Sequence, residues 1–441
     1  MKKLFLLMIP ALAALMSCSD GSSEDPSEDP NRAGKDPEMV IDMLPETRSI
    51  VLTQEQRAFV GKNTDFSFNL FRAISQMPEG KKSSIISPVS VTYVLGMLND
   101  GASGNTAKEI TSVVGFGEGK TQAVNDFCKK LIDEAPKTDP SVTLEIANIV
   151  IGNDYRHVGF EPQYEWDMQD YYRAEITNLD FSQKTETLAE VNGWCYDKTH
   201  GMIPEILNES ELKANALLLL MNAIYFKATW TEKFDPADTR DKTFTTEGGQ
   251  TLSLPMMHRK ALAQYSENDV CTMLNLPYGS GDKWSMKVLL PREGKTVDDV
   301  IASLNAESWQ QLRYSGWGPI VDIEIPRFKT TFETNLIEPL SALGAPTMFM
   351  PGVAEFPNIC SNYKKDIYVF LMKQKAAIEV DEEGTKASAV TIAEMKETSA
   401  GGPWDIEKPM NVDFHANRPF VYVIQEASSG VIFFLGTYRG E

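Results

Sequence analysis

The chain has 441 residues, of which 42% are hydrophobic, enough for two or three ordinary domains or one large one. Its 62 acidic and 42 basic residues give a formal net charge of −20. This charge argues against a nucleic-acid partner, because binding by counterion release needs clustered Lys and Arg. It indicates a soluble acidic surface and says little about the fold.

The first 17 residues have the pattern of an export signal. Lys2 and Lys3 precede an apolar run over residues 4–15, which is too short to span a bilayer as a mature helix. The run ends in LMSC, which resembles a bacterial lipoprotein cleavage box. We expect residues 1–17 to be a lipoprotein signal peptide and Cys18 to be lipidated. The alternative is an ordinary secretory peptide cut nearby.

Residues 18–48 are rich in Ser, Asp, Glu, Pro and Gly, a composition typical of a disordered tether. We therefore expect an exported protein whose only contact with the membrane is a lipid anchor, at the bacterial outer membrane or cell surface. No break in composition follows residue 48, so residues 49–441 are expected to form one large α+β domain.

Helical and strand patterns alternate along this domain without a fixed repeat. Apolar residues at helical spacing predict three helices, and alternating or apolar runs predict strands. The expected helices are 59–74, 90–98 and 188–200. The expected strands are 144–151, 216–226, 286–290, 321–328 and 369–380, with a hairpin formed by 422–426 and 431–435.

The sequence contains no recognisable catalytic, cofactor or metal motif. None of the four histidines lies in an HExxH pattern, and no GxSxG is present. The glycines of residues 115–121 miss the spacing of a phosphate loop and favour a turn before a helix. The remaining cysteines are too scattered for a metal site, and we expect no disulfide among them; they are Cys128, Cys195, Cys271 and Cys360.

The most informative segment is residues 379–395. A strand pattern ends at Gly384, and a second alternating segment begins at Thr385. One set of its alternate side chains is almost entirely small: Thr385, Ala387, Ala389, Thr391, Ala393 and Met395. The sequence SAGGPW that follows is typical of a loop. The segment is therefore able to form a strand but is predicted to lie in an exposed loop, from which it could insert into a sheet.

Five motifs in this chain resemble those of the serpin family, and they occur in the family's order. The hinge-like motif is EEGTKASA at 382–389. The others are SPVS at 87–90, NAIYFKATW at 222–230, IPRFK at 325–329 and NRPF at 417–420. The similarity extends from about residue 49 to the C-terminus.

The resemblance implies a fold of three β-sheets with about nine helices and an exposed reactive loop at about 382–410. It also implies a function, the suicide-substrate inhibition of serine proteases, with cysteine proteases as a second target class. The cleaved loop would insert as a strand of the main sheet and trap the acyl-enzyme. The alternatives are a non-inhibitory binding protein of the same fold and a surface lipoprotein. A monomer without a cofactor is expected.

By motif match, three groups of residues would control this insertion. The hinge would contain Glu382, Glu383, Gly384, Thr385, Ala387, Ala389 and Thr391. The region above the main sheet, called the breach, would contain Trp230, Arg327 and Glu382, with an ion pair between the last two. The shutter beneath the sheet would contain Ser87, Ser90, Asn222 and Gln374. Gln374 stands where the family usually has histidine, and as a buried amide it needs hydrogen-bond partners.

The reactive bond is the least determined feature. The family's usual loop length points to the bond between Thr398 and Ser399, which suits an elastase-like protease. Lys396 and Glu397 form the alternative bond, which suits a trypsin-like protease. The segment between the bond and Phe420 is about ten residues longer than is common in the family, so both bonds remain open.

Overall fold

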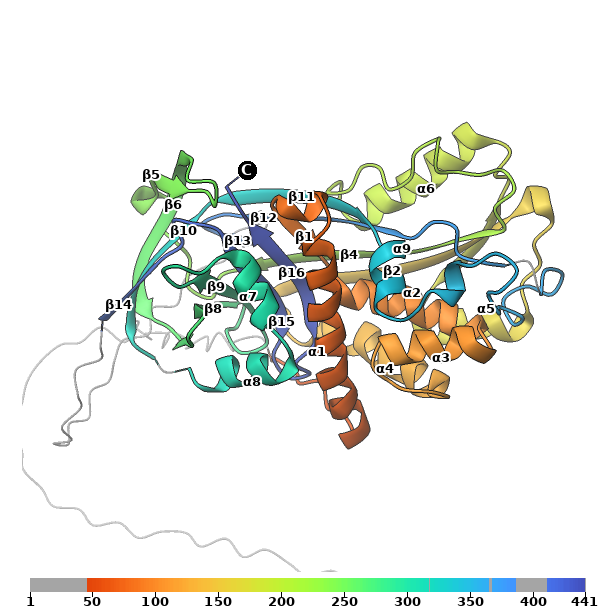
Figure 1. Ribbon diagram of the computed structural model, residues 1–441, viewed down its shortest axis with the longest axis horizontal. Coiled ribbons are helices and arrows are strands. Elements are labelled where there is room, and N and C mark those ends of the chain that lie inside the picture. The colour runs from red at the N-terminus through yellow and green to blue at the C-terminus, as the bar shows by residue number, and fades with distance from the viewer. Residues whose placement is uncertain (1–45, 317, 365–366, 386–410, 441) are drawn as a thin grey trace, which may run out of the picture. The chain divides into compact units, whose positions relative to one another are not determined.

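The structure is a computed structural model that describes residues 46–316, 318–364, 367–385 and 411–440 (Figure 1). Several residues singled out from the sequence lie outside the described residues: Cys18, Ala387, Ala389, Thr391, Lys396, Glu397, Thr398 and Ser399. None of the described helices is long and apolar enough to cross a membrane.

The described part of the chain mixes helices and strands along its whole length. Its α-helices are α1 (Gln54–Ser75), α2 (Pro88–Gly101), α3 (Gly104–Val113), α4 (Thr121–Glu134), α5 (Pro162–Tyr172), α6 (Lys184–Lys198), α7 (Val297–Ser303), α8 (Ala306–Tyr314) and α9 (Ile337–Ala342). The three helices expected from the sequence correspond to α1, α2 and α6, each with shifted ends.

One sheet has six strands, in the order β1-β16-β15-β9-β8-β7. These strands are β1 (Ser84–Ile86), β16 (Ile432–Tyr438), β15 (Phe420–Glu426), β9 (Trp284–Pro291), β8 (Cys271–Tyr278) and β7 (Tyr265–Glu267). The expected hairpin is present, because β15 and β16 pair antiparallel. Every residue of β9, β15 and β16 is buried, so this sheet lies in the core.

A second sheet has four strands, in the order β14-β10-β6-β5. They are β14 (Asn411–His415), β10 (Ile320–Pro326), β6 (Thr251–Leu262) and β5 (Arg240–Thr245). β14 is an edge strand that pairs parallel with β10. The strand expected at 321–328 is divided in the structure, because β10 ends at Pro326 and a separate strand begins at Phe328.

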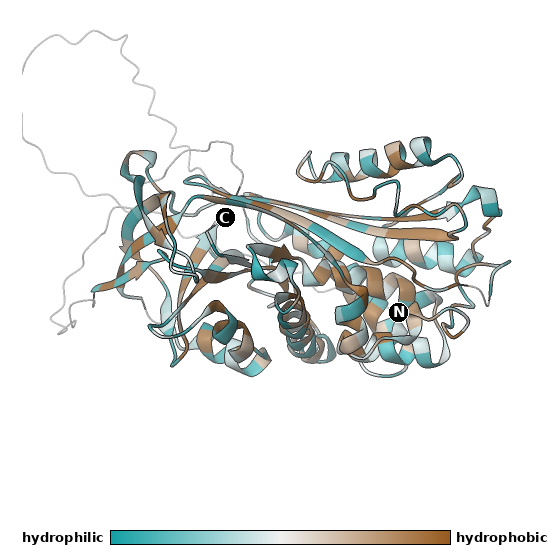
Figure 2. Ribbon diagram, turned by 45° about the horizontal axis from the view of Figure 1, so that its top comes forward, coloured by the Kyte–Doolittle hydropathy of each residue, from teal (hydrophilic) through white to brown (hydrophobic). Residues whose placement is uncertain are grey.

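The third sheet, which we call the central sheet, consists of two separate parts (Figures 1 and 2). The larger part has the order β13-β4-β2-β3, formed by β13 (Gly384–Thr385), β4 (Leu218–Thr229), β2 (Val142–Asn153) and β3 (Glu175–Leu179). The smaller part pairs β11 (Phe328–Asn335) with β12 (Lys373–Val380). Both α2 and α6 pack against β4, and the two views show α6 outside the sheet and α2 among the helices beneath it.

The strand expected at 369–380 is shorter in the structure. β12 begins at Lys373, and the backbone N–H of Val369 instead donates to the carbonyl of Met348. Alternation alone did not reveal this, since the apolar residues 369–372 are buried or partly buried although they form no strand.

Local signals explain where α2 and α4 begin. Ser87 accepts a hydrogen bond from the backbone of Ser90, and Pro88 occupies the first helical position of α2. Before α4, three glycines with positive φ form the turn that the sequence predicted, and they are Gly115, Gly117 and Gly119. The four cysteines in the described range are buried and unpaired.

Candidate functional site

The central sheet contains a gap between β4 and β12. The two strands line a common cavity of about 280 Å³, whose walls include residues 217–224 and 367–378. Side chains of α2, among them Val91 and Val94, close the cavity from below. Neither strand pairs with the other among the described residues. The site is therefore an apolar slot that runs along the edges of two strands.

A tight turn connects β12 to the slot. The backbone groups of Asp381 and Gly384 exchange hydrogen bonds of 3.0 and 3.2 Å, so the chain reverses over four residues. The Asp381 carboxylate accepts a further bond of 2.9 Å from the backbone of Glu383. Burial raises the pKa of Asp381, and the backbone hydrogen bonds oppose that effect.

β13 enters the slot directly after this turn. Gly384 pairs with Thr229 and Thr385 with Ala228, antiparallel to β4. Gly384 has φ +145°, and a Cβ there would lie 2.2 Å from the Ala228 carbonyl oxygen, so the position requires glycine. Thr385 is only 3% exposed, and its hydroxyl lies 2.7 Å from the hydroxyl of Tyr278.

This pairing concerns the first two residues of the loop that the sequence predicted to be mostly exposed over 384–410. Gly384 and Thr385 do not share that exposure, because they are buried and already paired with β4. The absence of a Cβ at Gly384 permits this, because a Cβ there would collide with the Ala228 carbonyl oxygen of β4. The remainder of that range, up to residue 410, lies outside the described residues.

Trp230 fixes the turn from the β4 side. Its indole N–H donates to the carbonyl of Asp381 at 2.9 Å, and its backbone N–H donates to Glu383 at the same distance. The indole also stacks on Tyr278, with ring centroids 4.5 Å apart and planes 10° apart. The buried tryptophan therefore ties β4, β8 and the turn together.

Arg327 and Glu382 form the ion pair that the sequence predicted. The guanidinium donates to both carboxylate oxygens of Glu382, at 3.1 and 2.5 Å. Thr239 donates to the same carboxylate at 2.7 Å. The Glu382 side chain is 6% exposed and the Arg327 side chain 49%. Burial opposes the charged form of Glu382, but the hydrogen bonds from Arg327 and Thr239 prevail and hold its pKa below the usual range.

The four shutter residues form one hydrogen-bonded network at the floor of the slot, in which the Ser90 backbone N–H donates to the Ser87 hydroxyl. Gln374 accepts from the backbone N–H of Ser87 and donates to its carbonyl, both at 2.9 Å. Ser90 bonds to Asn222, which also donates to Asn148 at 2.8 Å. The amide of Gln374 thus has the partners that its position requires. It joins β12 to the start of α2, while Asn222 joins β4 to the same helix.

The sequence of the chain matches the family model for serpins, serine protease inhibitors, over residues 61–439. The chain belongs to the serpin family. This serpin is 29% identical to mouse antithrombin-III over 380 residues, which cover 85% of this chain and 80% of that protein. It is 28% identical to an uncharacterized serpin-like protein of Thermococcus kodakarensis over 440 residues, covering 99% and 98% of the two chains.

Solved serpin structures share its fold. The thermophilic serpin tengpin in its native state is 26% identical, with a TM-score of 0.76 over 89% of this chain and 95% of that one. Human thyroxine-binding globulin, solved in complex with thyroxine, is 25% identical, with a TM-score of 0.75 over 87% and 98%. The α+β serpin fold expected from the motifs is confirmed, and the family consists in general of protease inhibitors rather than enzymes.

The motifs of this serpin did not reveal several residues that hold the hinge or the shutter. Tyr278 and Thr239 come from β8 and from the segment before β5, and Asn148 comes from β2. None lies in a segment that resembles a family motif. The register of β2 against β4 places Asn148 opposite Asn222, so only a correct strand pairing could have identified it.

Proposed function

We propose that this serpin is a suicide-substrate inhibitor of serine proteases that completes its central sheet with its own cleaved loop. The observation that carries the proposal is the open slot beside β4, which the chain already enters at Gly384 and Thr385. Because β13 already pairs with one end of β4, the residues after Thr385 could fill the slot by continuing the same strand.

Continuing the register of β13 shows how well the sequence would fit the slot. From the pairs Gly384–Thr229 and Thr385–Ala228, residue 395 would lie opposite Leu218, the first residue of β4. The twelve residues from 384 to 395 would therefore match the twelve of β4 and extend about 40 Å, at about 3.3 Å per residue. The alternating pattern of small side chains in the sequence also ends at residue 395.

The inserted side chains would suit their surroundings. Residues on the same face as Thr385 would be Ala387, opposite Phe226, and Ala389, opposite Ile224. Threonine would follow at 391, opposite Asn222. Small side chains enter a narrow slot without steric cost, and their burial adds to the main-chain hydrogen bonds gained by β4 and β12.

The chemical step belongs to the protease. Its serine oxygen would attack the carbonyl carbon of Thr398, the bond to the nitrogen of Ser399 would break, and an ester would join loop and enzyme. Insertion of residues 386–395 would then carry the ester, with the protease attached, away from the end at which the loop was attacked. With Thr398 as the residue that the protease recognises, the target would be elastase-like. With the bond after Lys396, it would be trypsin-like.

Incubation with pancreatic elastase and, in parallel, with trypsin tests the proposal. We expect a 1:1 complex at the summed mass that survives denaturing electrophoresis, together with release of the C-terminal fragment. Mass spectrometry of that fragment identifies the bond, because it begins at residue 399 or at residue 397. Complete cleavage without a stable complex by either enzyme or by a wider protease panel would contradict inhibition and favour a binding function.

We also propose that the inhibitor is exported and anchored through a lipid on Cys18. The support is the basic start, the short apolar run and the small residue before the cysteine. A lipid on Cys18 and the roughly thirty residues between it and the serpin domain would hold the inhibitor near a membrane while leaving that domain accessible. Expression of the full chain and of Cys18→Ser tests this, because only the first should fractionate with membranes. Equal fractionation of the two would contradict lipidation.

A further inference from the structure

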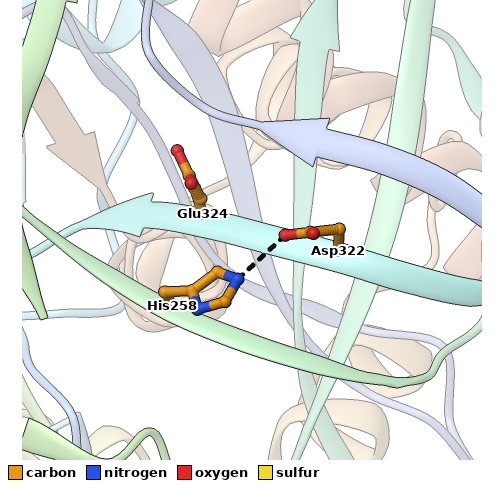
Figure 3. Close-up of side chains that lie close together, drawn as sticks. All are labelled: His258, Asp322 and Glu324. Atoms are coloured by element: carbon orange, nitrogen blue, oxygen red, sulfur yellow. Dashed lines mark hydrogen bonds and ion pairs between the residues drawn. The ribbon is translucent and has the colours of Figure 1, made fainter. Parts of the chain in front are cut away.

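Five histidine and acidic side chains gather on one face of the sheet formed by β14, β10, β6 and β5. The strand registers place His258 of β6, Glu324 of β10 and His415 of β14 in one row across the sheet. Asp322 and Asp413 occupy the neighbouring row of β10 and β14, and Lys260 of β6 lies opposite Asp322 in the same row. Figure 3 shows His258 and Asp322 pointing toward each other, with Glu324 further along β10. These residues take no part in the hinge or the slot.

The distances in this cluster are close to those of a metal site. Asp322, Asp413 and His415 each offer a ligand atom, and the three atoms lie within 4.8 Å of one another. The His415 Nε2 is 3.5 Å from an Asp322 oxygen. Ligands about 2.0–2.2 Å from a tetrahedral Zn²⁺ are separated by about 3.4 Å. Small side-chain rotations would therefore bring the three donors onto one ion.

Two of these three residues are carboxylates that lie side by side on neighbouring strands. Asp322 and Asp413 lie directly opposite each other in the parallel register, an arrangement in which like charges repel. Among the described residues, the Asp413 side chain has no hydrogen bond or ion pair. The His415 Nε2 is shielded from solvent and also lacks a hydrogen-bond partner. The carboxylates of Asp322 and Asp413 and the Nε2 of His415 thus lie close enough together to bind one ion.

A second set of possible ligands, His258, Asp322 and Glu324, is less suited to bind an ion than Asp322, Asp413 and His415. Glu324, which could join His258 and Asp322, is already paired with Lys242. The His258 Nε2 lies 2.9 Å from the Asp322 oxygen, so it already holds that carboxylate in place. A histidine that donates to a ligating carboxylate orients it and supports metal affinity.

We propose that Asp322, Asp413 and His415 bind a divalent transition-metal ion of the Zn²⁺ class, with His258 as a positioning residue for Asp322. Mixed nitrogen and oxygen donors suit such ions, and water would complete the coordination. Because Asp322 is about ninety residues before Asp413 and His415, the ligand spacing forms no motif, and the sequence had predicted no metal site.

The ion would connect the edge strand β14 to β10. β14 has β10 as its single hydrogen-bonded neighbour in the described sheet, and it is the first element after residue 410. Binding would therefore slow the opening of β14 and hold the C-terminal end of the reactive loop. This effect does not depend on whether the chain inhibits a protease.

Isothermal titration of the chelator-treated intact protein with Zn²⁺ tests the site. We expect one ion per chain, and amide hydrogen exchange over residues 411–415 should slow when Zn²⁺ is added. His415→Ala and Asp413→Asn should each abolish binding, and His258→Ala should weaken it at least about tenfold. The matched control is His200→Ala, which removes another partly exposed histidine near a carboxylate, that of Glu145.

Absence of Zn²⁺ binding by the wild-type protein would overturn the proposal, and so would unchanged affinity in both His415→Ala and Asp413→Asn. Melting curves of the metal-free variants show whether each is folded. Asp413 is exposed and unpaired, so its substitution keeps the test valid even where His415→Ala fails to fold. Equal loss of binding in His200→Ala would indicate nonspecific association and would also contradict the site.

Discussion

Strands β15 and β4 are both rich in apolar residues, but their surroundings differ. All seven residues of β15 are buried, and β16 and β9 pair with it on its two sides. The first five residues of β4, from Leu218 to Asn222, are each only partly buried. β4 pairs with β2 along its length, whereas on its other side β13 covers only Thr229 and Ala228. β4 therefore lacks a paired neighbour along most of one edge, whereas β15 has a neighbour on each edge.

A sheet that lacks a strand stores free energy that a completed sheet has already released. The six-stranded sheet can gain little from further pairing, whereas β4 and β12 still have main-chain groups and apolar surface to cover. The comparison therefore predicts that substitutions at the central slot change the stability of the intact protein and of the cleaved protein by different amounts. Changes in the six-stranded sheet should affect both forms alike.

The largest expected effect is the gain in stability on cleavage of the reactive loop. Filling a cavity of about 280 Å³ returns on the order of 7 kcal/mol, at about 24 cal/mol per Å³. For a chain of this length, that free energy raises the melting temperature by about 7 °C or more, at roughly 1 °C per kcal/mol. Scanning calorimetry of intact and loop-cleaved protein measures the difference.

The control for this prediction is the double variant Ala387→Asp/Ala389→Asp. Two carboxylates that must enter the slot oppose insertion, so the gain on cleavage should largely disappear, while the intact variant should melt like the intact wild type. Equal melting temperatures for intact and cleaved wild-type protein would mean that the central sheet stores no free energy.

The next effect concerns the residue already inside the slot. Thr385 is buried beside Tyr278, so Thr385→Arg places a charge where it has no partner, at a cost of several kcal/mol. The hinge should leave the slot, insertion should slow, and the protease should release cleaved inhibitor instead of forming a complex. The yield of complex per inhibitor cleaved should fall at least about tenfold.

Thr385→Val is the matched variant for that measurement. It keeps the size and branching of threonine and loses only the hydrogen bond to the Tyr278 hydroxyl, worth about 1 kcal/mol. We expect its yield of complex to remain close to that of wild type. A normal yield from Thr385→Arg would show that complex formation does not require entry of this side chain.

A third prediction concerns a buried lysine in the six-stranded sheet. Lys287 of β9 is 6% exposed, and its ammonium donates to the hydroxyl of Ser285 at 2.7 Å. Burial first, and the nearby Arg313 second, lower the pKa of Lys287 to about 7. In the unfolded chain a lysine has a pKa of about 10.4. Between these values the unfolded state binds more protons, so stability rises with pH.

Urea unfolding of the intact protein at pH 7, 8 and 9 measures this dependence. The contribution from Lys287 should increase stability by about 2–3 kcal/mol from pH 7 to pH 9, at up to about 1.4 kcal/mol per unit. Lys287→Met should remove the slope in both intact and cleaved protein. Lys329→Met, at a side chain that is 66% exposed, should leave it unchanged. A slope that persists in Lys287→Met would assign it to other groups.

The sequence predicted the parts of this site that depend on local pattern. The hinge motif identified Gly384, and similarity to the family identified the pair of Arg327 and Glu382. The sequence did not show how far the hinge has entered the slot. The alternation from Thr385 onward is compatible with both a strand and a loop, and the choice depends on β4 and Tyr278, which are distant in sequence. Strand alternation likewise could not locate the start of β12.

The smallest expected effect comes from the ion pair at the mouth of the slot. Arg327→Ala removes two hydrogen bonds from Glu382, but Thr239 remains bonded to that carboxylate. Because the Arg327 side chain is 49% exposed, solvent screens the pair, and its loss should cost no more than about 1 kcal/mol. Lys329→Ala, which removes a neighbouring exposed pair with Glu379, should cost less.

The pH dependence of the Arg327→Ala effect distinguishes the ion pair from simple packing. The pKa of Glu382 is lowered in the folded protein, so the pair stabilises the fold above the unfolded carboxyl pKa of about 4.3 and ceases to do so as pH falls through the lower folded value. The difference between wild type and variant should be largest at neutral pH and shrink below about pH 4. A difference that stays constant down to pH 3 would assign the effect to the arginine's packing. Cleaved protein should show a smaller difference than intact protein, because an inserted strand would hold the hinge in the slot without help from this pair.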